Sequence, residues 1–201
     1  PMYEIRTCTV EGCERPAVYE EQSCYRHLAD PPAFSRRIAA ILADNGTLSD
    51  ADLSGAVFED ANFTEVSLQG CRFSGASFHR CILSKSDVEL CFFDDAVFTD
   101  CTVHDARIRK SVFGAARLTG CDYTGSDIIQ CSWNGTSCSW VTFDDTDILH
   151  SRFIGAEITD TTFRNCNLKA VDFRRSTRVR VSFKYSNDED ATFSPEDVPW
   201  H

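Results

Sequence analysis

The sequence lacks three features that would place it at a membrane or on nucleic acid. It has no run of eighteen apolar residues, so we expect no membrane-spanning helix. It does not open with a basic segment followed by an apolar one, the pattern of a secretory signal, so we expect a cytoplasmic location. Lys and Arg are outnumbered, 20 against 31 Asp and Glu, and the net charge of −11 argues against a chain that coats nucleic acid.

The sequence also lacks a catalytic constellation. No Ser-His-Asp order, Gly-rich phosphate loop or HExxH helix occurs in it. His79, His104 and His150 fall on outward positions of the repeat described below, and on different sides of it. The acidic pair Asp94-Asp95 falls on an outward corner, where solvation explains it better than acid–base chemistry. We therefore predict a protein that is not an enzyme.

What the sequence does contain is a repeat of five residues that runs from residue 51 to residue 193 without an insertion. The central residue of each unit is apolar from Leu53 to Phe173, and thirteen of the fifteen Phe occupy such centres. Two positions earlier stands a small or β-branched residue, as in Ala51. Arg178 and Asp188 interrupt the centres, so we expect the last coil to be irregular. Internal repetition of this kind outranks local propensity as a guide to the fold.

A period of five fits neither a helix nor a straight strand, because the centres would point in many directions. It becomes consistent if the chain turns a corner every five residues, with four corners closing a coil of about twenty. Taking every twentieth residue gives one column that is almost all aromatic and another that is aliphatic. The first is Leu53, Phe73, Phe93, Phe113, Trp133, Phe153, Phe173 and Phe193, and the second is Leu68, Val88, Ile108, Ile128, Ile148 and Leu168. We expect about seven stacked coils.

These units, such as Ala51-Asp-Leu-Ser-Gly55, resemble the pentapeptide-repeat family, whose consensus is A(D/N)LXX. The resemblance implies an all-β, right-handed quadrilateral β-helix. We predict four segments along the chain: a zinc-binding module over 1–30, a linker and capping helix over 31–47, the β-helix over 48–193 and a tail over 194–201.

Eight of the eleven Cys fall on inward positions of the repeat, where Cys acts as a small buried hydrophobe. They are Cys71, Cys81, Cys91, Cys101, Cys121, Cys131, Cys138 and Cys166, and we call them the core thiols. Cys81, Cys101 and Cys121 are spaced by twenty and should stack, but their parallel side chains make a disulfide awkward. We expect free thiols, and metal capture or redox function is the alternative.

The other three Cys, together with a His, have the spacing C-x4-C-x10-C-x2-H. Cys8, Cys13, Cys24 and His27 would complete a closed tetrahedral Zn²⁺ shell. So short a segment has almost no core, and metal would supply its folding energy. The segment is similar to small Cys3His zinc fingers, although Ser23 stands where several of these have Gly. A closed shell has no open position for catalysis, so we predict structural zinc; unpaired surface thiols are the alternative.

Residues 34–45 are predicted to form a helix, preceded by Pro31-Pro32 and ended by Gly46. Phe34, Ile38, Ile41 and Leu42 share one face, which would plug the open first coil, or else receive a partner helix. At the other end, Trp200 would cover the last coil or join a second copy, because some family members dimerise there.

Two surface features could bind a partner. The charge is bipolar: residues 51–105 carry a net −7, whereas residues 164–184 carry a net +6. Ordinary solubility or steering of a partner would explain it. Outward apolar residues form the second feature. The candidate contacts are Asp94, Asp95, Arg174, Arg175, Arg178, Arg180, Ile129, Leu149, Ile154 and Trp140.

Three functions remain open at this point. The first is a protein-interaction module that presents a rigid, charged solenoid surface. The second comes from the resemblance: some bacterial pentapeptide-repeat proteins mimic DNA, bind DNA gyrase or topoisomerase IV and protect it from quinolones or other gyrase poisons. The third is nucleic-acid binding through the zinc head and the basic C-terminal coil.

Overall fold

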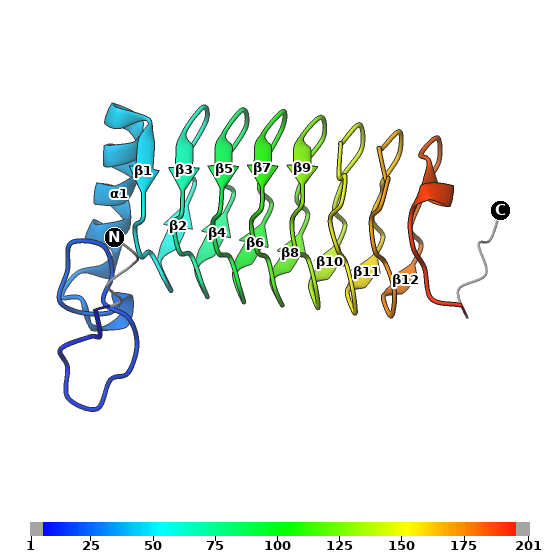
Figure 1. Ribbon diagram of the computed structural model, residues 1–201. Helices are drawn as coiled ribbons and strands as arrows, with labels where there is room; N and C mark the ends of the chain where they lie inside the picture. The colour runs from blue at the N-terminus through cyan, green and yellow to red at the C-terminus, as the bar shows by residue number, and fades with distance from the viewer. Residues whose placement is uncertain (1–5, 196–201) are drawn as a thin grey trace.

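The chain forms one elongated stack of coils with a helix and a small loop-rich module at its N-terminal end (Figure 1). The structure is a computed structural model and describes residues 6–195. A 3₁₀ helix, η1 (Tyr25–His27), lies in the N-terminal module, and α1 (Pro31–Asn45) follows it. A second 3₁₀ helix, η2 (Asp188–Asp190), lies at the far end. Among residues 6–195, no helix has the length and hydropathy needed to cross a bilayer.

Two parallel sheets of very short strands occupy opposite sides of the stack. One sheet contains, in order, β1 (Thr47–Ser49), β3 (Ser67–Gln69), β5 (Asp87–Glu89), β7 (Arg107–Arg109) and β9 (Asp127–Ile129). The other contains β2 (Val57–Glu59), β4 (Ser77–His79), β6 (Val97–Thr99), β8 (Arg117–Thr119), β10 (Ser137–Ser139), β11 (Glu157–Thr159) and β12 (Thr177–Val179). The remaining two sides pair through isolated parallel bridges, such as Arg72 with Phe92.

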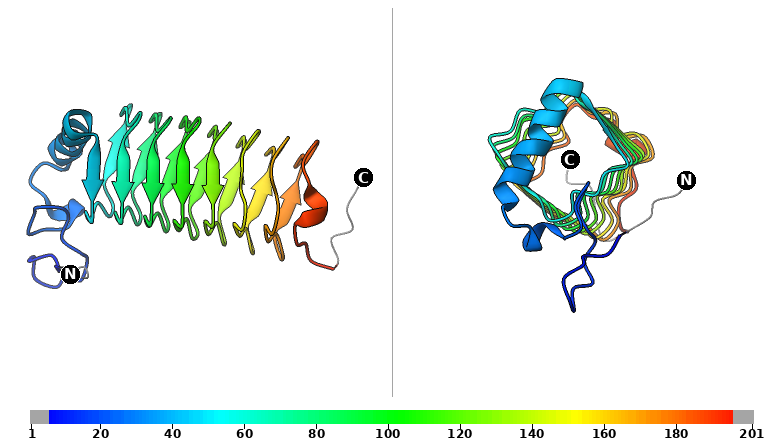
Figure 2. Two further views of the ribbon diagram at one scale, coloured as in Figure 1. Left: turned by 45° about the horizontal axis from the view of Figure 1, so that its top comes forward. Right: turned by 90° about the vertical axis from the view of Figure 1, so that its left-hand side faces the viewer.

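The register confirms a coil of twenty residues. Leu68 pairs with Val88, and Val88 pairs with Ile108, so each central residue lies on the one twenty positions later. Seen along its axis, the stack is four-sided (Figure 2). The fold is thus a parallel β-solenoid of about seven coils, as the repeat predicts.

The corners are left-handed backbone positions. Every fifth residue from Asp50 to Tyr185 has a positive φ, and most of these residues are not glycine. Positive φ costs an L-residue energy because its Cβ crowds the following carbonyl. The series stops after Tyr185, where η2 replaces the next regular corner. The last coil is therefore irregular, as the interruption at Asp188 predicts.

The core is a set of stacked side-chain columns. In the aromatic column, the rings of Phe73 and Phe93 are 4.9 Å apart and tilted by 2°, and those of Phe93 and Phe113 are 4.8 Å apart and tilted by 7°. The stack continues through Trp133 to Phe193. All eleven Cys are free, and the eight core thiols are buried. Burial raises the pKa of Cys131 and Cys138 to about 12, which keeps both protonated.

Helix α1 lies across the open first coil and covers its apolar edge (Figure 2). Phe34, Ile38 and Leu42 are buried against the solenoid core, as predicted. The helix begins at Pro31, earlier than the sequence pattern suggests. Both prolines fit in the first turn because the N–H groups of a first turn have no acceptor within the helix, so their absence in proline costs nothing there. Asp30 caps this turn by accepting a hydrogen bond from the Ala33 N–H, and Gly46, with a φ of 67°, ends the helix.

The Arg178 side chain packs against the last coil, at the opposite end of the stack. Its guanidinium lies 4.8 Å from the centre of the Phe193 ring and donates to the Ser176 hydroxyl at 2.7 Å. A charged residue at a core position is thus accommodated because the last coil leaves its head-group within reach of polar atoms. The predicted contact of Trp200 lies outside the described residues.

Candidate metal centre and interaction surfaces

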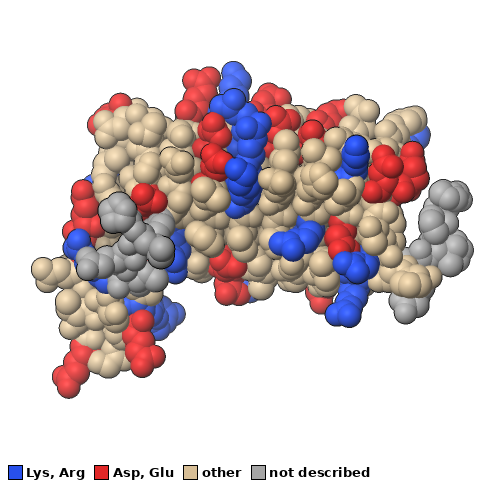
Figure 3. Space-filling model, in the orientation of Figure 1, with Lys and Arg blue, Asp and Glu red and all other residues tan. Residues whose placement is uncertain are grey.

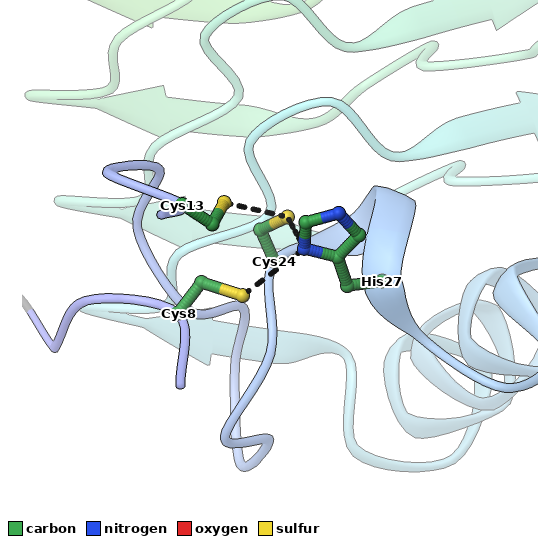
Figure 4. A group of neighbouring side chains, drawn as sticks. All are labelled: Cys8, Cys13, Cys24 and His27. Carbon is green, nitrogen blue, oxygen red and sulfur yellow. Dashed lines mark hydrogen bonds between the residues drawn. The ribbon is translucent and has the colours of Figure 1, made fainter. Parts of the chain in front are cut away.

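The three cysteines and the histidine of the N-terminal module point toward one another (Figure 4). Cys8 and Cys13 come from the first loop, Cys24 lies just before η1, and His27 ends η1. Their ligand atoms all lie within 4.8 Å of one another. Residues separated by up to nineteen positions thus form one group that could hold a metal ion.

Three distances within this cluster are close to those of a tetrahedral zinc site. Bond lengths of about 2.3 Å to sulfur and about 2.0 Å to nitrogen place two sulfurs about 3.8 Å apart and a sulfur and a nitrogen about 3.5 Å apart. The Cys13 and Cys24 sulfurs are 3.8 Å apart. The His27 Nδ1 is 3.4 Å from the Cys8 sulfur and 3.6 Å from the Cys24 sulfur. The chemistry of the donor set and these three distances therefore suit a metal ion such as Zn²⁺.

Local backbone hydrogen bonds bring these ligands together. A turn closed by the Cys13 N–H and the Val10 carbonyl returns the chain, and Gly12 supplies its positive φ of 75°. The Cys8 N–H donates to the Arg15 carbonyl at 2.8 Å. The His27 N–H donates to the Cys24 carbonyl at 2.9 Å, which sets both ligands on one turn.

The Cys8 thiol is more acidic than an ordinary cysteine. Its burial opposes ionisation, but hydrogen bonds from the Cys24 backbone and the His27 ring lower its pKa to about 6. Because zinc binds thiolates, a lowered pKa reduces the cost of releasing the proton.

The module is attached to both the cap and the solenoid. Arg37 of α1 contacts Glu20 at 2.8 Å and Glu21 at 2.9 Å. The Tyr19 N–H donates to the Asp52 carbonyl of the first coil at 2.7 Å. The Tyr25 hydroxyl lies 3.1 Å from the Ser35 hydroxyl in buried surroundings. These contacts fix the orientation of the module relative to the rod.

The four apolar residues predicted to form a contact surface do not all lie on the same side of the rod. Ile129 and Leu149 lie on adjacent coils of one side, and Ile154 lies on the next side; all three are half-buried. Trp140 is 67% exposed, at a corner with a φ of 58°, on a different side of the rod. The structure thus does not place Trp140 with the three aliphatic residues.

The predicted charged contacts differ in availability. Asp94 is half-buried, and this burial raises its pKa, whereas Asp95 is exposed on a corner. Arg174 contacts Asp172 at 2.6 Å, and Arg180 pairs with Asp160. Arg175 is exposed, and Arg178 lies inward as described above. Much of the basic charge of the last coils is therefore balanced locally.

Ion pairs between coils reduce the bipolar charge along the rod, and positive and negative groups alternate on its surface (Figure 3). Residues twenty apart lie directly over one another, so an acid in one coil meets a base in the next. Arg80 contacts Asp60 at 2.7 Å, and Arg164 contacts Asp144 at 2.6 Å.

An apolar feature that the sequence analysis missed lies on an intermediate coil. Leu90 is 46% exposed and Phe92 is 38% exposed, and Phe92 pairs with the neighbouring Val112. Phe92 is one of two Phe that do not occupy a repeat centre, and this was the available signal.

The fold defines the chain as a β-solenoid with four-sided coils of five-residue units. The family model for pentapeptide repeats matches eight copies within residues 47–84 and 136–175. This match covers 78 of the 201 residues and identifies pentapeptide repeats in these two segments.

Solved structures that resemble this chain include QnrB1 and two pentapeptide-repeat proteins. The plasmid-mediated fluoroquinolone resistance protein QnrB1 is 16% identical, with 75% of this chain and 82% of that chain covered and a TM-score of 0.40. HetL from Nostoc sp. strain PCC 7120, involved in the regulation of heterocyst differentiation, is 13% identical, with 76% and 89% covered and a TM-score of 0.31. A protein of the Arabidopsis thaliana thylakoid lumen is 19% identical, with 66% and 68% covered and a TM-score of 0.28. No curated protein sequence matches the chain.

Proposed function

We propose that this chain is a non-enzymatic protein-interaction module, whose rigid solenoid presents its outer faces to a cytoplasmic partner. The observation that carries the proposal is the exposure of large apolar side chains, above all Trp140, on a rod whose interior is filled. The cavity inside the rod between Phe93, Phe98 and Phe113 has a volume of only about 10 Å³, which is too small for a substrate. Exposed apolar groups on a rigid scaffold are typical of contact surfaces.

Trp140 is the first contact residue to test. Aromatic anchors contribute most to protein interfaces, and truncation of one costs about 2 kcal/mol or more in affinity. The partner should be captured from the cells that produce the protein by photo-crosslinking through a probe placed beside Trp140. Trp140→Ser should abolish a crosslinked band that Tyr185→Ser, a control at an aromatic residue that is even more exposed, retains. Bands that both variants retain would refute this surface.

The N-terminal module is proposed to hold one structural Zn²⁺ through Cys8, Cys13, Cys24 and His27. Metal would fix the head against α1 and the first coil, and the head would provide a second contact region. Metal analysis of protein purified without chelator should give about one zinc per chain. A value below about half an equivalent would refute the site. Cys13→Ser should lower the zinc content, whereas Cys138→Ser in the core should not.

The alternative from the family resemblance is a DNA mimic that binds DNA gyrase or topoisomerase IV. The overall net charge of −11 supports it, but the carboxylates neutralised by Arg80, Arg107 and Arg164 weaken a continuous acidic surface. A supercoiling assay with and without ciprofloxacin separates the two. Neither inhibition nor protection of gyrase would remove the mimic and leave the interaction module standing.

Two further proposals are tested cheaply. Nucleic-acid binding through the head and the basic coil would give a salt-dependent shift in DNA retardation, and no shift at low salt would end it. Self-association through the C-terminal coil would double the mass in light scattering at micromolar concentration; a monomer at every concentration would refute it.

A further inference from the structure

A basic cavity lies where the N-terminal module meets the first two coils. Its volume is about 520 Å³, within the range of small-ligand pockets. Arg15 comes from the loop after Cys13, Arg26 from η1 and Arg72 from the second coil, so three separate segments each bring one guanidinium to it. None of the residues that line the cavity is acidic.

The charges around this cavity are unusual for the chain. Within residues 6–195, Arg15 and Arg26 form no ion pair, although acids outnumber bases. Arg72 is 3.8 Å from Asp52, a long pair, and its guanidinium also lies 5.7 Å from the centre of the Phe92 ring. Elsewhere on the rod a base such as Arg80 makes a close pair with an acid one coil away. The guanidiniums at the cavity are thus left largely uncompensated.

A neutral donor and open space complete the cavity. The Ser54 hydroxyl oxygen is buried and, among the described residues, has no hydrogen-bond partner. An unsatisfied buried hydroxyl is costly unless a ligand or water pairs with it. Gly75 borders the cavity, and a side chain added there would meet no atom within 4 Å, so the space is free. Pro16 and Tyr25 provide apolar wall.

We infer that this cavity binds a phosphate group. Three guanidiniums, set against the Asp52 carboxylate and the Asp94 carboxylate that interacts with Arg72, sum to a charge of about +1, so the cavity attracts a phosphate monoester, which carries about −1.5 to −2. Guanidinium recognises phosphate oxygens through paired N–H donors, and the Ser54 hydroxyl adds a further donor. The volume exceeds that of the phosphate alone and leaves room for an attached organic group against Pro16 and Tyr25.

The phosphate has two possible carriers, a free small molecule or a phosphorylated side chain of a partner. Isothermal titration calorimetry on the full chain, purified without chelator, distinguishes them with three probes: inorganic phosphate, phenyl phosphate and a phosphoserine peptide. Tighter binding of phenyl phosphate assigns the site to a small molecule, and tighter binding of the peptide assigns it to a partner. Either outcome supports the phosphate site.

Variants test whether the three arginines form the site. The double variant Arg15→Gln/Arg26→Gln should bind at least about tenfold more weakly, since each charge-assisted hydrogen bond contributes strongly. Arg109→Gln/Arg117→Gln is the matched control, because it removes the same charge from two exposed arginines that make no ion pair within residues 6–195. The control should change affinity by less than about twofold, as expected from screened long-range charge.

Two outcomes would overturn the proposal. One is the absence of saturable binding of all three probes up to about 1 mM. The other is an equal loss of affinity in the control, which would show that net charge alone attracts the anion. Circular dichroism spectra of both double variants should match that of the parent, since the substituted side chains are exposed. The test is independent of Trp140, so its failure would leave the protein-interaction proposal unchanged.

Discussion

Truncation of Phe113 tests the principle that holds the rod together. The Phe113 ring is 2% exposed and is stacked between Phe93 at 4.8 Å and Trp133 at 3.9 Å. Phe113→Ala should lower the free energy of unfolding by about 3–5 kcal/mol, because it removes buried apolar area and leaves a cavity between close-packed coils. Phe92→Ala should cost less than about 1 kcal/mol because the Phe92 ring is partly exposed and lies outside the column. Urea unfolding followed by circular dichroism measures both.

A double-mutant cycle separates stacking from simple burial. Phe93 and Phe113 are in contact, so their substitutions should couple by about 0.5–1.5 kcal/mol. Phe73 contacts Phe93 and is separated by it from Phe113, so Phe73 and Phe113 should show almost no coupling. Equal coupling for the two pairs, or a loss below about 1 kcal/mol for Phe113→Ala, would refute the reasoning.

Three other predictions concern corners, pH and thiols. Leu90 has a φ of 55° and an exposed side chain. Leu90→Gly should raise the free energy of unfolding by about 0.5–1 kcal/mol, because the left-handed strain that it relieves is larger than the entropic cost of ordering a glycine. A lower urea midpoint would contradict this. Hydrogen bonds from Arg180 hold the pKa of Asp160 below its usual value, so ionised Asp160 stabilises the folded protein. This stabilisation is complete above a pH of about 3.9 and is lost as the pH falls through the lower pKa of the folded state. Thermal melts should therefore show a shallower acid loss in Asp160→Asn than in the parent, and identical profiles would exclude the pair as a source of acid sensitivity. After metal removal, a thiol reagent should modify the three thiols of the N-terminal module in the native protein, whereas the eight core thiols should react only after unfolding. Rapid modification of more than three thiols in the native state would show that the coils open.

The sequence predicts the coil well because a strict period leaves few geometrical solutions. A repeat of five with apolar centres forces corners, and the aromatic column from Phe73 to Phe173 forces four of them per coil. The ligands of the metal cluster are also readable, since the spacing of Cys8, Cys13, Cys24 and His27 is independent of the rod. The coil prediction is confirmed because it depends on local order along the chain; the structure brings the four predicted ligands together, and zinc binding stays a prediction.

Other features depend on contacts that no local pattern contains. Arg178 is predicted as a partner contact from its charge, and the structure places its guanidinium over the Phe193 ring in the irregular last coil. The positive charge over residues 164–184 looked like a basic patch, but Arg164 and Arg180 meet acids of the preceding coil. For Arg164 and Arg180 the residue twenty positions earlier, in the preceding coil, decides what the side chain contacts, whereas Arg178 contacts Ser176 and Phe193 at its own end of the rod.

The repeat itself explains why distinctive chemistry gathers at the N-terminal end. In the middle of the rod, most inward positions fill the core and many charged outward ones pair between coils, so few polar groups are left for a ligand. At the end, the first coil has no preceding coil, and the module and α1 cover it with residues outside the repeat. Arg15 and Arg26 come from this added segment and face Ser54 and Arg72 of the coils. A specific site thus forms where a non-repeated segment meets the repeat, and variation in the module should change what this end binds while the fold of the rod stays the same.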